Sequence, residues 1–479
     1  MGILRAANAN KQEDKVKKVK QMVVLAAFVG LAINTYADVQ NIRISGDIRI
    51  RGYELVNTAG SDDEDQVKNK DNFISQRTRV TVEADLEDHI LAVVTLRAEG
   101  LWGSNDEAVE SETGLGDTPG GSAGAGLAGV GNRRINRGWD LGINEAYVQF
   151  SEMFYAPMTL KVGRQYLNYG HGLIFSSAEQ EYNFDAARLV LDYYPLTIDV
   201  VYARLGERSS FGSGSSTHLN DIQALFINGR YEFTDSLIKN IEAYFGYVIN
   251  GNDSSSFDGT SRIPPIANSN GDSPMLIGLR GDVNLTENFQ TWFEGAYEFG
   301  SGSAGTTENI SAFLANVGGK LTLKDVNMVP AFNFNYIYAS GGGSEGEHSF
   351  RPWFDYVDGY NGHLFMPLLS NIHVFNLGAS VKPSENTSVS VQGFYYLKVD
   401  KDSSVGSNPN VDFGGIGFFS ANDSREIGWE IDTILGYDYS KDVRFQLVYA
   451  AFIPGNALHA DQAADSVAHL VRGEINARF

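Results

Sequence analysis

The most constraining feature of the sequence is a long, strict alternation of apolar and polar residues near its C-terminus. In residues 426–452 (EIGWEIDTILGYDYSKDVRFQLVYAAF), apolar side chains occupy nearly all odd positions on both sides of the break 440–442. The even positions include Glu430, Asp432, Arg444 and Gln446. Because successive side chains of a strand point to opposite faces, this period predicts a β-hairpin with one apolar and one polar face. Its strands are longer than the roughly five to six residues usual in soluble domains.

The same alternation recurs along the chain, and no helical period competes with it. We identify 18 alternating segments, which begin near residues 41, 73, 90, 141, 158, 184, 197, 219, 241, 274, 289, 310, 328, 371, 388, 426, 443 and 467. Their connectors alternate in length: eight are short, such as 86–89 and 440–442, and nine are longer and rich in Gly, Ser, Asp and Asn, such as 251–273. We therefore predict an all-β chain that forms a closed antiparallel transmembrane β-barrel of about 18 strands, with short periplasmic turns and long extracellular loops.

In such a barrel the apolar face contacts outer-membrane lipid and the polar face lines a water-filled lumen. The alternative is a soluble sandwich or propeller, but these folds show no regular succession of short and long connectors. The last strand, VRGEINARF, places Val471, Ile475 and Phe479 on one face. A terminal strand that ends on an aromatic residue resembles the C-terminal signal of bacterial outer-membrane proteins. The resemblance implies that the barrel-insertion machinery recognises Phe479.

The N-terminal segment has the pattern of a secretory signal. The apolar run MVVLAAFVGLAI at 22–33 follows several lysines and precedes Thr35-Tyr36-Ala37. A membrane-spanning helix needs about 18 or more apolar residues, which argues against the alternative of an N-terminal anchor helix. We predict a signal peptide at 1–37 and a single barrel domain at 38–479.

Charge and composition narrow the class of partner. The formal net charge of −22 argues against nucleic-acid binding, and the absence of cysteine fits export through an oxidising compartment. The eight histidines show no metal-ligand spacing, and no nucleophile motif stands out. We therefore expect neither an enzyme nor a bound metal or cofactor. A barrel enzyme and a surface-adhesion barrel remain the alternatives to a channel.

Three stretches resemble the alginate export family of 18-stranded outer-membrane porins. They are the hairpin at 426–455, the segment EAYVQF at 145–150 followed by LKVGRQYLNYG at 160–170, and FDAARLVLDYY at 184–194. The resemblance implies a bacterial outer-membrane channel that passes small or anionic solutes, including export of an anionic polysaccharide through an arginine-rich lumen. It matches Arg164 and Gln165 to the GRQ element of the family, and Arg188 and Asp192 to its arginine-containing strand. The oligomeric state stays open.

Alternation and the family motifs together predict which side chains line the pore. These are Arg43, Asp47, Arg49, Arg77, Arg79, Glu83, Arg97, Glu99, Glu145, Lys161, Arg164, Arg188, Asp192 and Arg230. Their basic members concentrate on one wall. They either brace the barrel as cross-strand ion pairs or create a transverse field that sorts charged solutes. Arg164 shares the lipid-facing parity of Leu160 and Val162, so a bulge at Gly163 must turn it inward, or the register differs.

Two long connectors are candidates for narrowing the channel. Residues 103–140 run from acidic to Gly-rich to basic, and this loop either folds inward as a constriction or forms an extracellular flap. Residues 345–369 are rich in aromatic side chains. We expect them to pack as a lid or as a surface on which sugars stack.

Overall fold

The computed structural model describes most of the barrel and part of its connections. The described residues are 41–57, 70–86, 89–103, 139–177, 183–206, 222–250, 273–301, 309–342, 347–351, 353, 361–403, 405–406, 418–419, 424–457 and 467–479. The predicted signal peptide at 1–37 and residues 104–138 of the first candidate constriction lie outside this part of the chain.

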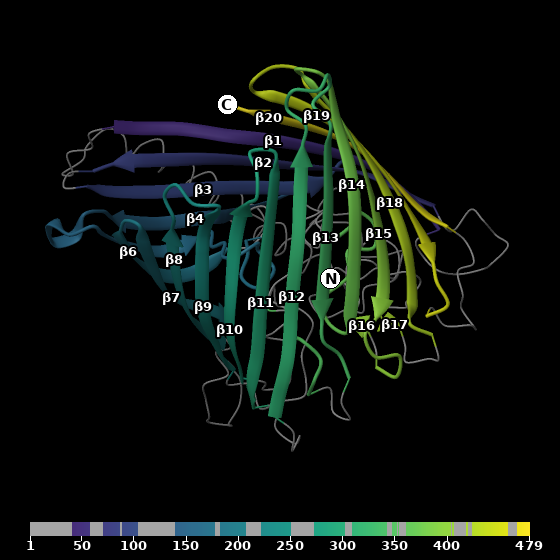
Figure 1. The fold of residues 1–479 in the computed structure, drawn as a ribbon. Helices are drawn as coiled ribbons and strands as arrows, with labels where there is room; N and C mark the ends of the chain where they lie inside the picture. Colours follow the sequence, from purple (N-terminus) through teal and green to yellow (C-terminus); the bar gives the residue numbers. More distant parts are fainter. Residues whose placement is uncertain are drawn as a thin grey trace, which may run out of the picture.

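Eighteen antiparallel strands form one closed sheet (Figure 1), because β1 pairs with both β2 and β20. The strands are β1 (Asn41–Val56), β2 (Lys70–Asp85), β3 (Ile90–Leu101), β4 (Asp140–Phe150), β5 (Met158–Gln165), β6 (Phe184–Tyr193), β7 (Leu196–Gly206), β8 (Ile222–Glu232), β9 (Ile238–Asn250), β10 (Ser273–Asn284), β11 (Phe289–Ser301), β12 (Asn309–Thr322), β13 (Ala331–Ala339), β14 (Ile372–Ser384), β15 (Thr387–Lys398), β18 (Glu426–Asp438), β19 (Val443–Pro454) and β20 (Ala468–Arg478). A separate short ladder joins β16 (Val405–Gly406) and β17 (Phe418–Phe419), and a 3₁₀ turn spans Met153–Tyr155. The prediction of a closed 18-stranded barrel is confirmed.

Consecutive strands are neighbours throughout, so successive connections lie at opposite ends of the barrel. We call the end with the short connectors the turn end and the other end the loop end. The turn at 440–442 closes through the Ser440 hydroxyl, which accepts a hydrogen bond from the amide of Val443 at 3.1 Å. The C-terminus also lies at the turn end, where the amide of Phe479 donates to the carbonyl of Gly46 at 3.0 Å. Within the described residues, no helix is long and apolar enough to cross a membrane.

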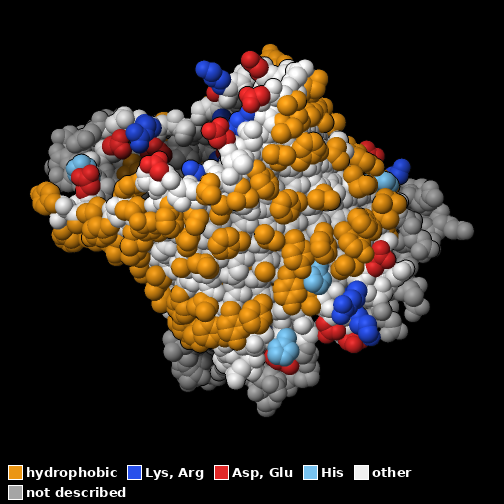
Figure 2. Space-filling model, in the orientation of Figure 1, with side chains coloured by type: hydrophobic (Ala, Val, Ile, Leu, Met, Phe, Trp, Pro, Cys, Tyr) orange, Lys and Arg blue, Asp and Glu red, His pale blue; other side chains and the backbone are white. Residues whose placement is uncertain are grey.

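The opening hairpin shows why this sequence requires a barrel in lipid. On its outward face, Trp429, Phe445 and Tyr449 are 48%, 39% and 42% exposed. On its inward face, Glu430 and Asp432 are fully buried. Figure 2 shows that apolar side chains cover much of the outward surface of the near wall, while charged ones gather at its upper rim, beside a hollow, and at its lower right edge. The apolar surface is therefore outside, as the two-residue period predicts for a membrane barrel.

The inward face does not stay polar along its whole length, unlike the predicted water-filled lumen. On β1, the buried inward residues change from Asp47, Arg49 and Arg51 at the turn end to Tyr53 and Leu55 toward the loop end. Similar apolar residues on other strands join one buried cluster.

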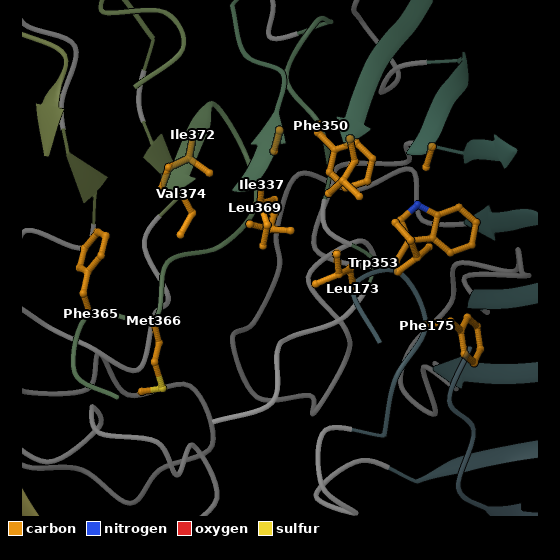
Figure 3. Close-up of a cluster of buried hydrophobic side chains, with 14 of the residues drawn as sticks. Leu173, Phe175, Ile337, Phe350, Trp353, Phe365, Met366, Leu369, Ile372 and Val374 are labelled. Carbon is orange, nitrogen blue, oxygen red and sulfur yellow. The ribbon is translucent and has the colours of Figure 1, made fainter. Parts of the chain in front are cut away.

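Chain segments that follow β5 and precede β14 fold into the barrel and complete this cluster (Figure 3). Residues 166–177 follow β5 and contribute Leu173 and Phe175, and residues 361–371 precede β14 and contribute Phe365. The apolar inward positions of the loop half therefore face protein, while the turn half carries the charged positions. In the aromatic connector at 345–369, the described residues Phe350 and Trp353 are buried, so this part packs as expected, but inside the barrel.

Candidate functional site

A charged pocket of about 650 Å³ lies inside the turn end of the barrel. β1, β2, β18, β19 and β20 contribute most of its lining, and residue His363 of the segment 361–371 also faces it. We call this pocket the vestibule. Its basic side chains are Arg49, Arg51, Arg77, Arg79, Lys441, Arg444, Arg472 and Arg478, and its acidic side chains are Asp47, Asp438, Asp442 and Glu474. Eight basic groups against four acidic groups give the lining a formal charge of +4 when His363 is neutral.

Strand register places these arginines side by side. Arg49 lies directly opposite Arg77 across the β1–β2 pair, and Arg79 lies opposite Arg97 across the β2–β3 pair. Directly opposed like charges destabilise a sheet unless other groups neutralise them. These arginines therefore depend on neighbouring carboxylates for neutralisation.

Carboxylates from the same strands hold the arginines in place. Asp47 lies between two of them, 3.3 Å from a guanidinium nitrogen of Arg77 and 2.5 Å from Nε of Arg79. Glu474 lies 2.5 Å from Nε of Arg51, a contact that joins the first and last strands. The N–H donors of a guanidinium lie in its plane, so a carboxylate that accepts from them also restricts the orientation of that plane.

Glu99 extends this network to β3. It forms an ion pair with Arg97 and lies 3.8 Å from a guanidinium nitrogen of Arg49. The structure thus brings together the predicted pore-lining residues of the first three strands, apart from Arg43 and Glu83. Those two pair with each other at 2.9 Å near the exposed start of β1, where Asp85 also approaches Arg43 at 3.3 Å.

The remaining predicted residues lie along the wall from β4 to β8, outside the vestibule. Glu145 accepts from the Thr95 hydroxyl at 3.3 Å, and Lys161 lies 3.5 Å from the centre of the Tyr147 ring. Arg188 pairs with Asp199 at 2.6 Å. Nearer the turn end, Asp192 accepts from Thr197 at 3.2 Å and Arg230 pairs with Glu232 at 3.3 Å. Each of these residues has a local partner, and none lines the pocket.

Arg164 is the exception, because it lies on the outward face of the barrel. It is opposite Ala146 in an unshifted register, two residues from the exposed Val162. Its guanidinium binds Asp185 through two contacts of 2.8 Å, and the two side chains are 41% and 55% exposed. Gly163 has a φ of +126°, and a Cβ there would meet the carbonyl oxygen of Ala146 at 2.2 Å. Nevertheless, the pairing of β4 with β5 has no register shift at this residue, so side chains on its two sides keep alternating between the faces. The expected inward turn of Arg164 is therefore wrong.

On other parts of the inward face, sequence reasoning missed buried carboxylates that bind chain segments inside the barrel. Glu430 accepts the amides of His363, Leu364 and Phe365 at 2.7–2.8 Å. Glu298 accepts the amide of Arg351 and the indole nitrogen of Trp353, both at 2.9 Å. Their partners lie far away in sequence, so no local pattern reveals them.

A second group of carboxylates, on β9, β10 and β11, faces the tip of the segment 166–177. Its members are Glu242, Asp282 and Glu294, and Arg280 lies among them. The one sequence signal for this contact is the motif Gly170-His171-Gly172, in which both glycines adopt positive φ.

Comparison with known proteins gives a family and a fold. The family model of alginate export matches residues 49–471. No curated protein sequence matches the chain. Among solved structures, Acinetobacter baumannii OccAB2 is similar at a TM-score of 0.54 and 11% identity, over 93% of this chain and 99% of the other. Pseudomonas aeruginosa OpdL is similar at a TM-score of 0.54 and 11% identity, over 92% of this chain and 99% of the other. The outer membrane protein OprD from Pseudomonas aeruginosa is similar at a TM-score of 0.53 and 12% identity, over 92% of this chain and 96% of the other. The chain thus belongs to the alginate export family and is a β-barrel channel of the bacterial outer membrane.

Proposed function

We propose that this channel passes small hydrophilic solutes and prefers anionic ones, which it binds in the vestibule. The observation that carries the proposal is the lining of that pocket, where eight basic side chains face four acidic ones. The match to the alginate export family supports solutes that bear carboxylates, including an anionic polysaccharide.

The acidic chain does not contradict an anion preference. The formal charge of −22 is a sum over the whole sequence, whereas a solute in the lumen responds to charges within a Debye length of about 8 Å at physiological salt. The basic lining of the vestibule therefore dominates the field at that end of the lumen.

Guanidinium chemistry suits binding rather than catalysis. An arginine side chain remains charged at every relevant pH and presents a planar fork that fits a carboxylate. It does not exchange protons with a substrate near neutral pH, so the arginines suit electrostatic binding of an anion rather than acid–base catalysis. This supports a channel rather than a barrel enzyme.

Charge reversal in the vestibule tests the proposal. We expect Arg77→Glu/Arg79→Glu to shift the reversal potential in planar bilayers toward cations under a salt gradient. Lys324→Glu/Lys382→Glu changes the same number of charges, on the exposed turn after β12 and at the exposed end of β14, and should leave the reversal potential unchanged. Because Arg77 is buried, the milder Arg444→Gln on the rim serves as a second variant and should give a smaller shift of the same sign. Equal potentials in the vestibule variants and the wild type would show that the arginines only brace the wall.

A further inference from the structure

Residues 166–177 form a hairpin, here called the strap, that leaves the end of β5 and reaches the wall built from β9, β10 and β11. We propose that a protonated His171 holds the strap against this wall, so that the strap docks at acidic pH and releases as the pH rises. The strap would then act as a proton-controlled gate inside the barrel.

The strap is a compact hairpin with its own hydrogen bonds. The amide of Tyr169 donates to the carbonyl of Phe175 at 2.9 Å, and the Asn168 side chain accepts from the Ser176 hydroxyl at 3.0 Å and the Ser177 amide at 2.8 Å. Its tip turns at Gly170 and Gly172, with φ of +60° and +76°. These bonds lie within the hairpin and do not depend on its contacts with the wall, although its apolar side chains, Leu173 and Phe175 among them, also pack in the buried cluster.

At the tip, His171 contacts the wall through both its backbone and its ring. Its amide donates to Oε2 of Glu294 at 3.0 Å, and ring Nδ1 lies 3.1 Å from the same oxygen. Ring Nε2 lies 3.6 Å from a carboxylate oxygen of Asp282. A neutral imidazole has one N–H, whereas an imidazolium has two. Since both ring nitrogens face carboxylates, the site fits the protonated form.

The surrounding charges favour the same form. The groups that face the tip are Glu242 and Tyr244 from β9, Arg280 and Asp282 from β10, and Glu294 from β11, with the Trp292 ring of β11 at 5.8 Å from the imidazole. Three carboxylates against one guanidinium leave a formal charge of −2 before His171 is counted. Protonation of His171 reduces it to −1, whereas a neutral ring leaves it unchanged.

The direction of the pH response follows from the pKa of His171. Burial alone would lower this pKa, but the hydrogen bonds to Asp282 and Glu294 outweigh burial and raise the pKa above its usual value. In a released strap the ring returns to an ordinary pKa of about 6.5. The His171 contribution to docking is therefore complete below about pH 6.5 and is lost as the pH rises through the raised pKa of the docked state.

Release would also change what a solute meets in the lumen. Docking covers Glu242 and Glu294, which are 4% and 2% exposed. An undocked strap would uncover these carboxylates and Asp282, so the anion preference should weaken at alkaline pH. This change in selectivity rests on the proposed function, whereas the pH-dependent position of the strap does not.

Thiol labelling measures the position of the strap directly, because the chain contains no cysteine. Leu173→Cys puts one thiol on a strap residue that is 1% exposed. Its labelling by a methanethiosulfonate reagent is compared at pH 5.5 and 8.5 in the folded barrel. Each labelling rate is divided by the rate of Ser440→Cys, on the exposed turn, at the same pH. This division corrects for the larger fraction of reactive thiolate at higher pH. Ser176→Cys, nearly isosteric, is the second reporter if Leu173→Cys does not fold.

We expect the corrected labelling rate of Leu173→Cys to rise with pH. The rise should be up to about tenfold for each unit by which the pKa of His171 in the docked strap exceeds its pKa in the released strap. His171→Gln/Leu173→Cys should give one high rate at both values. The matched control His363→Gln/Leu173→Cys, altered in the other inward segment, should behave like Leu173→Cys alone. A corrected rate that does not change with pH, or a pH response that survives His171→Gln, would overturn the proposal. Neither result bears on the vestibule, which the reversal potential tests separately.

Discussion

His171 and Glu294 meet inside the barrel although 123 positions separate them in the sequence, with ring Nδ1 3.1 Å from the carboxylate oxygen. One residue lies at the tip of the strap and the other on β11. This contact and the arginine-rich vestibule give the interior two parts. The loop half is filled by inward segments that are anchored to buried carboxylates, and the turn half is a basic pocket.

Gly170 should be essential for the docked strap. Its φ is +60°, and a Cβ there would lie 2.3 Å from a carboxylate oxygen of Glu294. Gly170→Ala combines a left-handed conformation, which costs about 1–2 kcal/mol in a non-glycine residue, with a clash at the anchoring carboxylate. We expect the Leu173→Cys thiol in this variant to label rapidly even at pH 5.5. Gly142→Ala is the control, because the added methyl group meets nothing within 4 Å; equal labelling in both variants would contradict the expectation.

The contact between Arg51 and Glu474 should stabilise the closure of the barrel. It joins β1 to β20 at 2.5 Å, and the two side chains are 7% and 12% exposed. Glu474→Gln removes the charge and should lower the free energy of unfolding by about 2 kcal/mol, because the buried guanidinium loses a charged acceptor. The measurement is urea unfolding in lipid vesicles. Asp438→Gln removes a carboxylate from a half-exposed pair with Arg444, and it should lower the free energy of unfolding by less than about 1 kcal/mol. Equal losses in the two variants would show that the contact between the first and last strands stabilises the barrel no more than an exposed ion pair does.

Phe479 should matter for assembly in the membrane. Its amide and carbonyl exchange hydrogen bonds of 3.0 and 2.8 Å with Gly46, and these bonds extend the pairing of β1 with β20 by one residue at the turn end. Deletion of Phe479 should leave export across the inner membrane intact and reduce the amount of folded barrel in the outer membrane. Phe479→Tyr keeps both the backbone bonds and the aromatic ring, so it should assemble normally. Wild-type levels of the deletion variant in the outer-membrane fraction would refute this role.

The strands and their faces could be predicted because they follow from a local rule. A strand with lipid on one side must alternate, and the long runs around Trp429 and Phe445 show that period without help from distant residues. Alternation was also the better guide at Arg164: its parity indicated lipid, whereas the family motif indicated the lumen, and the structure places it outward.

The inward segments could not be predicted in the same way. The path of a loop depends on which distant groups can bind its backbone, as when Glu430 accepts the amides of Leu364 and Phe365. An isolated acidic residue on a predicted inward face gives no sign of such a partner. The apolar inward positions Tyr53 and Leu55 did carry a signal, because a water-filled lumen would leave them exposed to solvent.

The sign of the reversal potential of the wild-type channel tests the central claim most directly. A single channel is recorded in a planar bilayer under a tenfold potassium chloride gradient at pH 5.5, where we expect the strap to be docked. The basic vestibule predicts a potential displaced toward the chloride equilibrium value, despite a chain of net charge −22. A potential displaced toward the potassium value would contradict the account, because it would show that the arginines do not set the field that the solute crosses.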